Sequence, residues 1–100
     1  MTQMVENLSL KKMEQLCTLI DEKFVSQIIN DKKIYINDSG EFFFPRYVTD
    51  HKEIDCLFFE YADNESDAKK DLFYDGEWIY IPDYQDANSL FEEAVKQINS

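Results

Sequence analysis

Four acidic residues in the second half of the chain have a spacing that could bind calcium. Positions one, three, five and nine of a calcium-binding loop would be held by Asp63, Glu65, Asp67 and Asp71. Position six of such a loop needs a glycine for its sharp turn, and position twelve needs a glutamate that binds the ion through both oxygens. Those positions hold Ala68 and Tyr74. Because the most specific parts of the motif are missing, we expect no metal site in this segment.

The single histidine has acidic neighbours of the kind used in general acid–base catalysis. The residues around His51 include Asp50, Glu53 and Asp55. Nearby carboxylates stabilise the charged form of an imidazole. A hydrolase would also need a nucleophile, and Cys56 belongs to an apolar run in which a thiol acts as a small hydrophobic group. We therefore expect no catalytic residues, and no cofactor either, because the two glycines form no glycine-rich phosphate loop.

The net charge of −11 comes from one part of the chain. Residues 1–37 contain five basic and five acidic side chains, whereas residues 53–93 contain thirteen acidic side chains against only Lys69 and Lys70. A soluble domain usually carries a net charge of magnitude ~2 to 8 with both signs interspersed. Self-repulsion of this size destabilises a compact protein and provides only solubility and long-range attraction. The asymmetry therefore predicts a positively charged partner.

Length and composition predict one folded domain over residues 1–100. Thirteen of the fifteen aromatic residues fall between Tyr35 and Tyr84, whereas disordered acidic chains are poor in aromatics. Cys17 and Cys56 lack the spacing of a metal site. With no apparent secretion signal and no apolar run near the ~20 residues of a membrane span, we expect a cytoplasmic protein with reduced thiols. A single disulfide between the two cysteines stays open as an alternative.

An amphipathic helix is predicted over residues 9–29, with Asn7 or Ser9 as its cap. Apolar side chains recur there at steps of three and four, namely Met13, Leu16, Cys17, Ile20, Phe24 and Ile28. After Asn30-Asp31 the period changes to two, and Asp38-Ser39-Gly40 provides a turn into a second strand over residues 41–48. Pro45 cannot donate a hydrogen bond to a neighbouring strand, so this strand is expected at a sheet edge or with a bulge.

The second half of the chain predicts more strands and a closing helix. Residues 54–61 are apolar on both faces and should form a central strand, while residues 62–71 should be a solvated, mobile connection. Asp75-Gly76 favours a type I′ hairpin between residues 72–74 and 77–81. Ser89 and Glu92 form a capping box for the last helix. The predicted fold class is α+β: an N-terminal helix, an antiparallel meander of four to five strands and a C-terminal helix, with both helices on one sheet face.

These features favour a small, non-catalytic protein that binds and inhibits a basic partner, such as a nuclease, a toxin or another nucleic-acid-handling protein. Rows of carboxylates beside exposed aromatic rings would imitate a nucleic acid in front of a Lys/Arg groove. Direct nucleic-acid binding is not expected, because the chain's own basic residues are few and scattered. Bacterial immunity proteins and phage-encoded inhibitors have a similar size and charge, which is an analogy of class without a shared motif.

Eleven residues are candidates for contact with that partner. Electrostatic attraction would be followed by burial of Tyr and Trp anchors, which tolerate a half-wet interface. The candidate anchors are Tyr61, Trp78, Tyr80 and Tyr84, and the candidate acidic residues are Asp63, Glu65, Asp67, Asp75, Glu77, Asp83 and Asp86.

Two other functions stay open. The chain could be an adaptor or an oligomeric subunit, a homodimer included, that pairs through an exposed sheet edge while its charge serves only solubility. It could also be a small hydrolase that uses His51 with nearby carboxylates. The hydrolase ranks last, because no nucleophile is placed to serve it.

Overall fold

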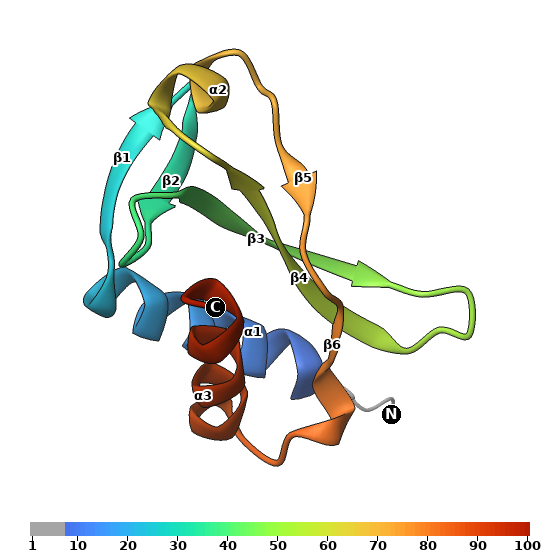
Figure 1. Cartoon of the computed structure of the whole chain (residues 1–100). Coiled ribbons are helices and arrows are strands. Elements are labelled where there is room, and N and C mark those ends of the chain that lie inside the picture. Colours follow the sequence, from blue (N-terminus) through green and yellow to red (C-terminus); the bar gives the residue numbers. More distant parts are fainter. Residues whose placement is uncertain (1–7) are drawn as a thin grey trace.

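In the computed structural model, which describes residues 8–100, an N-terminal helix comes first in the chain, an antiparallel sheet follows, and a second long helix closes the chain (Figure 1). The α+β class predicted from the sequence is confirmed. The elements, in chain order, are α1 (Leu8–Lys23), β1 (Val25–Ile29), β2 (Lys32–Ile36), β3 (Phe42–Thr49), β4 (Asp55–Ala62), α2 (Glu65–Lys69), β5 (Tyr74–Asp75), β6 (Ile79–Tyr80), the 3-10 helix η1 (Ile81–Asp83) and α3 (Ala87–Ile98).

The sheet is a meander whose last partner is divided in two. Strands pair in the order β1-β2-β3-β4-β5, and β6 also pairs with β4. All pairs are antiparallel. None of the helices within residues 8–100 is long and apolar enough to cross a membrane.

The first helix ends earlier than predicted, because residues 25–29, which were expected to be its last turns, form a strand. α1 ends at Lys23, and Val25–Ile29 pairs with β2 in a register that places Ile29 opposite Lys32. The two residues between them, Asn30 and Asp31, both have positive φ, 52° and 67°. A two-residue hairpin turn needs this conformation, which Asn and Asp tolerate. The β-branched residues of this segment favour a strand, although their spacing also fits a helix. Of the two predicted caps, Ser9 lies inside α1, and Asn7 lies outside the described residues.

The turn between β2 and β3 is as predicted, and a buried asparagine organises it. Gly40 has a φ of 85°, which explains a glycine at this position. Asn37 is 5% exposed, and its Oδ1 accepts hydrogen bonds from the backbone N–H groups of Ser39 and Glu41. Its Nδ2 donates to the Ile98 carbonyl oxygen at 2.7 Å. The turn is therefore tied to the last residue of α3.

β4 is the central strand, as its two apolar faces predicted. It pairs with β3 along one side and with β5 and β6 along the other. β3 pairs with β2 only through Phe42 and Phe43, so Pro45 lies beyond β2 with a single neighbouring strand. The prediction that this strand lies at a sheet edge or has a bulge is wrong, because β3 lies between β2 and β4 and pairs with β4 in a continuous register. Pro45 is tolerated because the pairing with β2 ends before it, which leaves no strand paired on that side to need its missing N–H.

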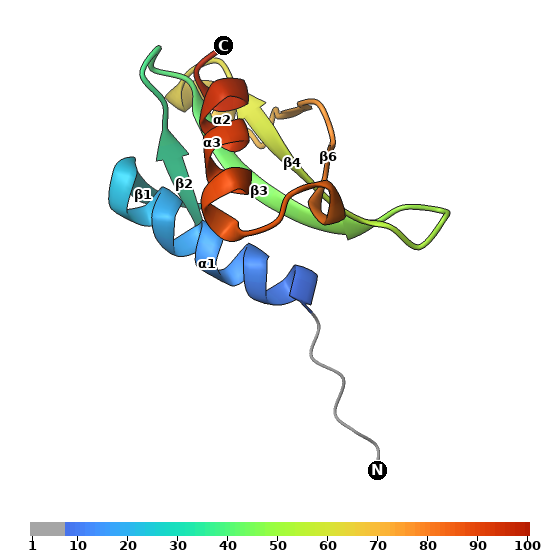
Figure 2. The same ribbon diagram turned by 90° about the horizontal axis from the view of Figure 1, so that it is seen from below.

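Both helices cover the same face of the sheet, as predicted (Figure 2). Phe43 of β3 and Phe59 of β4 are fully buried at the centre of this interface, with ring centroids 5.8 Å apart. The core between the helices and the sheet is formed by Met13, Leu16, Ile20, Phe24, Tyr35, Phe43, Leu57, Phe59, Tyr61, Ile79, Ile81, Leu90, Ala94 and Ile98.

The opposite face has a smaller core near α2, which corrects the prediction of a solvated connection over residues 62–71. Residues 65–69 form α2, whose N-cap Asn64 accepts a hydrogen bond from the Asp67 N–H at 2.8 Å. Ala68 is only 1% exposed and packs with Ile29, Ile34, Phe42 and Ala62. A single methyl group suffices to anchor this turn, because the sheet surface beneath it is apolar.

The predicted hairpin at Asp75-Gly76 is wrong. β5 and β6 do not pair with each other; both pair with β4, one after the other. Gly76 is not among the residues with positive φ. Its N–H donates to the Phe59 carbonyl oxygen at 2.7 Å, and a Cβ at this position would lie 2.6 Å from Cε2 of Tyr61. The glycine therefore permits a close approach to β4, not a tight turn.

The closing helix begins earlier than the predicted capping box. Its N-cap is Asp86, whose carboxylate accepts a hydrogen bond from the Ser89 N–H at 2.8 Å. This bond lowers the pKa of Asp86, and the charge of Lys12 adds a smaller effect in the same direction. The predicted apolar stripe is confirmed, since Leu90, Ala94 and Ile98 are buried.

We predict that Gly76→Ala lowers the free energy of unfolding by about 1 to 3 kcal/mol, the usual cost of overpacking. The added methyl group would collide with the Tyr61 ring, so the loss should be smaller in a background that carries Tyr61→Leu. Urea unfolding of the wild type, both single variants and the double variant measures this coupling.

Gly40→Ala is the matched control. No heavy atom lies within 4 Å of a Cβ at Gly40, so its cost, about 1 to 2 kcal/mol, would come from the left-handed backbone alone. That cost should be the same in the wild-type background and in the Tyr61→Leu background. Equal losses for Gly76→Ala in the two backgrounds would contradict the collision.

Candidate functional site

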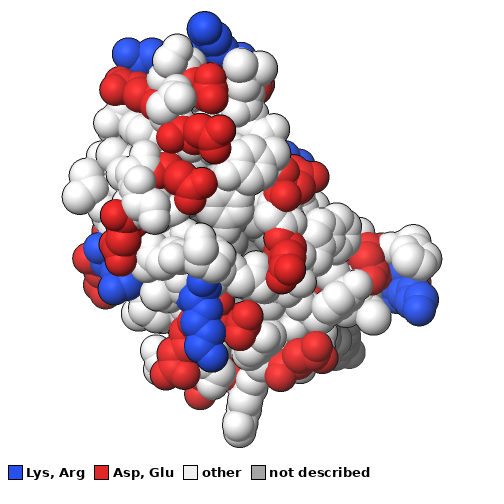
Figure 3. Space-filling model, in the orientation of Figure 1, with Lys and Arg blue, Asp and Glu red and all other residues white. Residues whose placement is uncertain are grey.

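A row of acidic side chains follows the sheet edge formed by β5 and β6 and continues over η1 onto α3. Residues 71–93 contain no basic residue. We call the exposed acidic residues from β5 to α3 the acidic edge; they are Asp75, Glu77, Asp83, Asp86 and Glu92. Figure 3 shows carboxylates along the course that β5, β6 and η1 take in Figure 1.

None of the acidic-edge carboxylates forms an ion pair with a basic residue among residues 8–100. The ion pairs recorded between residues 8 and 100 join Lys32 to Asp71, Lys33 to Asp21, Arg46 to Glu60 and Lys69 to Glu65. Asp71, which pairs with Lys32, lies at the α2 end and is not part of the acidic edge. The carboxylates of the acidic edge are therefore available to an external cation.

Two of the four predicted aromatic anchors lie on the surface beside these carboxylates. Trp78 is 44% exposed and Tyr80 is 41% exposed. The Trp78 ring stacks on Phe58 at a centroid distance of 5.4 Å and an interplanar angle of 4°. Because Phe58 supports one face of the indole, Trp78 is already oriented before any partner arrives.

The other two predicted anchors belong to the interior. Tyr84 is partly buried against the main core, and its carbonyl oxygen accepts a hydrogen bond from Lys12 Nζ at 2.7 Å. Burial, together with the charges of Glu93 and Asp83, raises the pKa of Tyr84. Tyr61 is only 7% exposed. In the sequence, Tyr61 lies on the same face of β4 as Leu57 and Phe59, which already indicated a position in the core.

The three predicted acidic residues around α2 do not join the acidic edge. α2 lies at the far end of the molecule from η1 (Figure 1). Glu65 pairs with Lys69 at 3.1 Å, and the Lys69 ammonium holds the pKa of Glu65 below its usual value. Asp63 accepts a long hydrogen bond from the Tyr74 hydroxyl, at 3.4 Å. Asp67 is partly buried beside the N-cap of α2.

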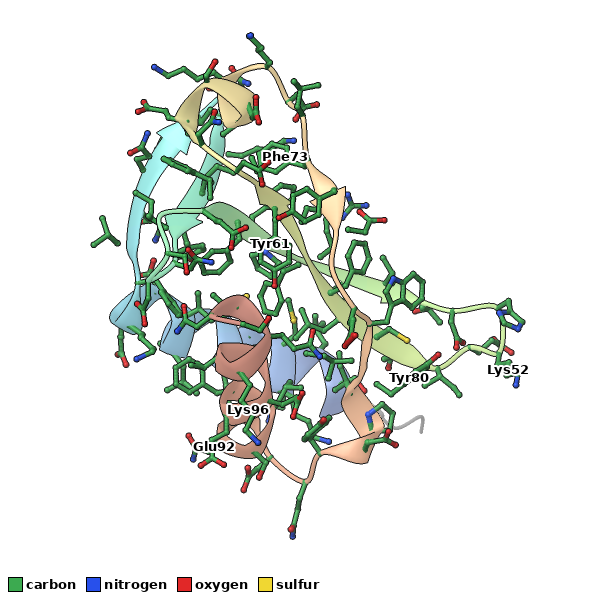
Figure 4. The ribbon with its side chains drawn as sticks, in the orientation of Figure 1. Lys52, Tyr61, Phe73, Tyr80, Glu92 and Lys96 are labelled. Atoms are coloured by element: carbon green, nitrogen blue, oxygen red, sulfur yellow. The ribbon has the colours of Figure 1, made fainter. Side chains whose placement is uncertain are left out.

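The residues considered for metal or acid–base chemistry form no metal-binding group and include no exposed thiol within residues 8–100 next to His51. No group of three His, Cys, Asp or Glu side chains among residues 8–100 is arranged to hold a metal ion. His51 is exposed in the β3–β4 connection, next to Lys52, which marks the tip in Figure 4. Cys56 is fully buried, and burial raises the pKa of its thiol. These positions do not support a thiolate–histidine pair.

A hollow of about 420 Å³ lies between the β5–β6 segment and the C-terminal end of α3. Its lining residues are Tyr61, Gly76, Glu77, Lys96, Gln97 and Ser100. A smaller hollow of about 140 Å³ shares Tyr61, Gln97 and Ser100 with it and adds Glu41 and Tyr74. The sequence alone could not find Glu41, Tyr74, Lys96 or Gln97, because four separate segments of the chain meet here.

The two tyrosines of this region stack on each other and lie close to carboxylates. Their ring centroids are 5.7 Å apart, and the Tyr74 hydroxyl donates to Glu41 Oε2 at 3.0 Å. Burial, aided by the negative charge of Glu41, raises the pKa of Tyr61 to about 12. Burial and the Glu41 hydrogen bond, aided by Asp63, raise the pKa of Tyr74 to about 12. The local environment therefore opposes additional negative charge.

No protein-family model matches this chain, and comparisons with curated proteins and with solved structures find no significant similarity. Its function must therefore be inferred from its own surface.

We predict that alkaline pH destabilises the fold through Tyr61. A tyrosine in an unfolded chain ionises near pH 10, whereas Tyr61 in the fold has a pKa of about 12. The raised folded-state pKa stabilises the protein fully below about pH 10, and this contribution is lost as the pH rises toward 12. The free energy of unfolding, measured with urea across this range, should fall less steeply in Tyr61→Phe. Identical slopes in the two proteins would contradict the prediction.

Proposed function

We propose that the protein is a non-catalytic binding module that docks its acidic edge on a basic surface of another protein and blocks it. The observation that carries the proposal is the row of unpaired carboxylates from Asp75 to Glu92 beside the exposed rings of Trp78 and Tyr80. The preferred partner is a nucleic-acid-handling protein, because its groove carries the Lys and Arg side chains that such a row would meet.

The excess of acidic residues within residues 53–93 of the sequence gives only part of the folded surface an excess of negative charge. Figure 3 shows carboxylates spread over the displayed face from α2 to α3, with basic side chains mostly toward its periphery. Around α2 the negative charges of Glu65 and Asp71 are balanced by Lys69 and Lys32. The proposal therefore assigns docking to the β5–η1–α3 side, where no such ion pairs are recorded, and withdraws it from the α2 end.

The proposed mechanism has two stages. Unpaired carboxylates attract the basic partner over several ångströms, which raises the association rate at low ionic strength. Trp78 and Tyr80 then exchange water for partner surface, which slows dissociation. Because Trp78 already rests on Phe58, little side-chain entropy is lost at that step.

The test is affinity capture at low salt with two variants of equal charge. One variant neutralises the acidic edge with Asp75→Asn, Asp83→Asn and Glu92→Gln. The control neutralises three exposed acids on the α1–β2 side, with Glu14→Gln, Glu22→Gln and Asp31→Asn. Wild type and control should retain the same basic proteins, identified by mass spectrometry, whereas the edge variant should lose them. Association with a captured protein should also slow at least tenfold between about 50 and 200 mM salt.

Equal retention by all three proteins would contradict the proposal, since charge would then act without regard to position. A captured partner whose association rate ignores ionic strength would overturn the attraction step. Trp78→Ala should raise the dissociation rate with little effect on the association rate, because the indole acts after the encounter.

A specific observation also favours the second candidate function, an adaptor or subunit that pairs through a sheet edge. β1 forms the outer edge of the sheet opposite β5, and its Val25 and Ile28 are 72% and 68% exposed. An exposed apolar edge strand can pair with another chain. Positive and negative side chains balance over residues 1–37, so a second copy could approach this edge without meeting the acidic row.

This second candidate predicts a homodimer that Ile28→Lys converts to a monomer, because a charge on the edge opposes strand pairing. Light scattering during size-exclusion chromatography measures the mass of both proteins. Thr18→Lys, an exposed change on α1, is the control for added charge. A monomeric wild type at high micromolar concentration would rule out pairing through β1.

A further inference from the structure

Tyr61 is a largely buried residue whose hydroxyl has no hydrogen-bond partner among residues 8–100. The side chain is 7% exposed, and none of the hydrogen bonds within this part of the chain uses its oxygen. The neighbouring Tyr74 hydroxyl, by contrast, donates to Glu41 Oε2 at 3.0 Å, and Asp63 Oδ1 lies 3.4 Å from the same oxygen. A buried tyrosine hydroxyl usually has a partner, and leaving one unpaired is costly. A ligand could therefore provide the hydrogen-bond partner that the Tyr61 hydroxyl lacks in this part of the chain.

Tyr61 lines both hollows beside the acidic edge. It reaches them from β4, while Gly76 and Glu77 contribute from the β5–β6 segment and Gln97 from α3. Figure 4 shows Tyr61 between β4 and the C-terminal end of α3, with Lys96 further along the same helix. The larger hollow, about 420 Å³, falls within the ~300 to 1,000 Å³ range of small-ligand pockets. An inserted side chain would therefore fit.

The lining selects for a cation that donates several hydrogen bonds. Glu77 provides a carboxylate to the larger hollow and Glu41 provides one to the smaller hollow, while the Gln97 amide and the Tyr61 hydroxyl, on residues that line both, provide neutral acceptors. The Tyr74 ring, which is 49% exposed and stacks on Tyr61, adds a surface for cation–π contact at the smaller hollow. An apolar ligand would leave these groups buried and unpaired, and an anion would face both carboxylates. Lys96, exposed at the rim, is the competing internal cation.

We propose that the larger hollow, lined by Tyr61, Glu77 and Gln97, is a socket for an arginine side chain of the basic partner. The inference rests on the proposed function and names the group that the partner inserts. A planar guanidinium has five N–H donors in a fixed fork and stacks on aromatic rings, so it can serve Tyr61, Glu77 and Gln97 together. A lysine ammonium has three donors and a stronger hydration shell, so it fits this lining less well.

The test uses Nα-acetyl-arginine methylamide as the probe, titrated into the full-length protein and followed by amide chemical shifts in NMR. The matched probe is the citrulline analogue, which has nearly the same shape without the charge. Saturable shifts at Gly76, Glu77 and Gln97 are expected for the arginine probe, with shifts from the citrulline probe at least fivefold weaker in apparent affinity. The corresponding lysine probe should bind more weakly than the arginine probe.

Three variants locate the binding. Tyr61→Phe keeps the stacked ring and removes only the hydroxyl, so affinity for the arginine probe should fall about tenfold. Glu77→Gln, an exposed change that leaves the core intact, should weaken binding severalfold. Lys96→Gln should strengthen it, because the competing cation is removed. Unchanged amide shifts elsewhere in each variant show that the fold is preserved.

Absence of saturable shifts at these amides, or equal binding of the arginine and citrulline probes, would overturn the socket. The two proposals fail separately, since the capture variant leaves Glu77 and Tyr61 unchanged. If capture depends on the acidic edge while Tyr61→Phe binds the partner as well as wild type, the docking function stands and the socket falls. If the arginine probe binds but capture ignores the acidic edge, the socket stands and the docking function falls.

Discussion

The close approach of Gly76 to β4 determines where the acidic residues lie. Its N–H bonds to the Phe59 carbonyl oxygen at 2.7 Å, and any side chain at this position would overlap the Tyr61 ring. This contact holds the chain flat along β4, so that β5 and β6 follow each other along one edge. In the hairpin that the sequence predicted, residues 72–74 and 77–81 would have paired with each other instead of with β4. Held along the edge, Asp75 and Glu77 belong to a continuous row that runs on to η1.

A second constraint fixes the other wall of the hollow. Asn37 uses both of its amide donors and its oxygen, which satisfies a buried polar group completely. Its bond to the Ile98 carbonyl oxygen holds the end of α3, and its bond to Glu41 Oε1 positions a carboxylate whose other oxygen accepts from Tyr74. The end of α3, the β2–β3 turn and the β5 segment therefore meet at a defined distance. Tyr61 lies buried at the place where they meet.

The distribution of charge follows from these contacts more than from sequence distance. Lys32 of β2 and Lys69 of α2 reach Asp71 and Glu65, so the α2 end carries little unpaired charge. No comparable basic residue pairs with the β5–η1–α3 side among the ion pairs described. A stretch that is uniformly acidic in sequence thus becomes one balanced end and one unbalanced edge. The unbalanced edge also carries the exposed indole of Trp78.

The sequence by itself determined the fold class, the two helices on one face and the central strand, because hydrophobic periodicity acts locally. It also identified Trp78 and Tyr80 as aromatic residues beside acids. Tertiary contacts decided what local patterns left ambiguous. Val25–Ile29 is a strand because β2 is available to pair with it, and Gly76 serves packing because Tyr61 lies opposite. The unpaired Tyr61 hydroxyl and its hollow arise only where β4, the β5–β6 segment and α3 converge, and no spacing along the chain encodes that convergence.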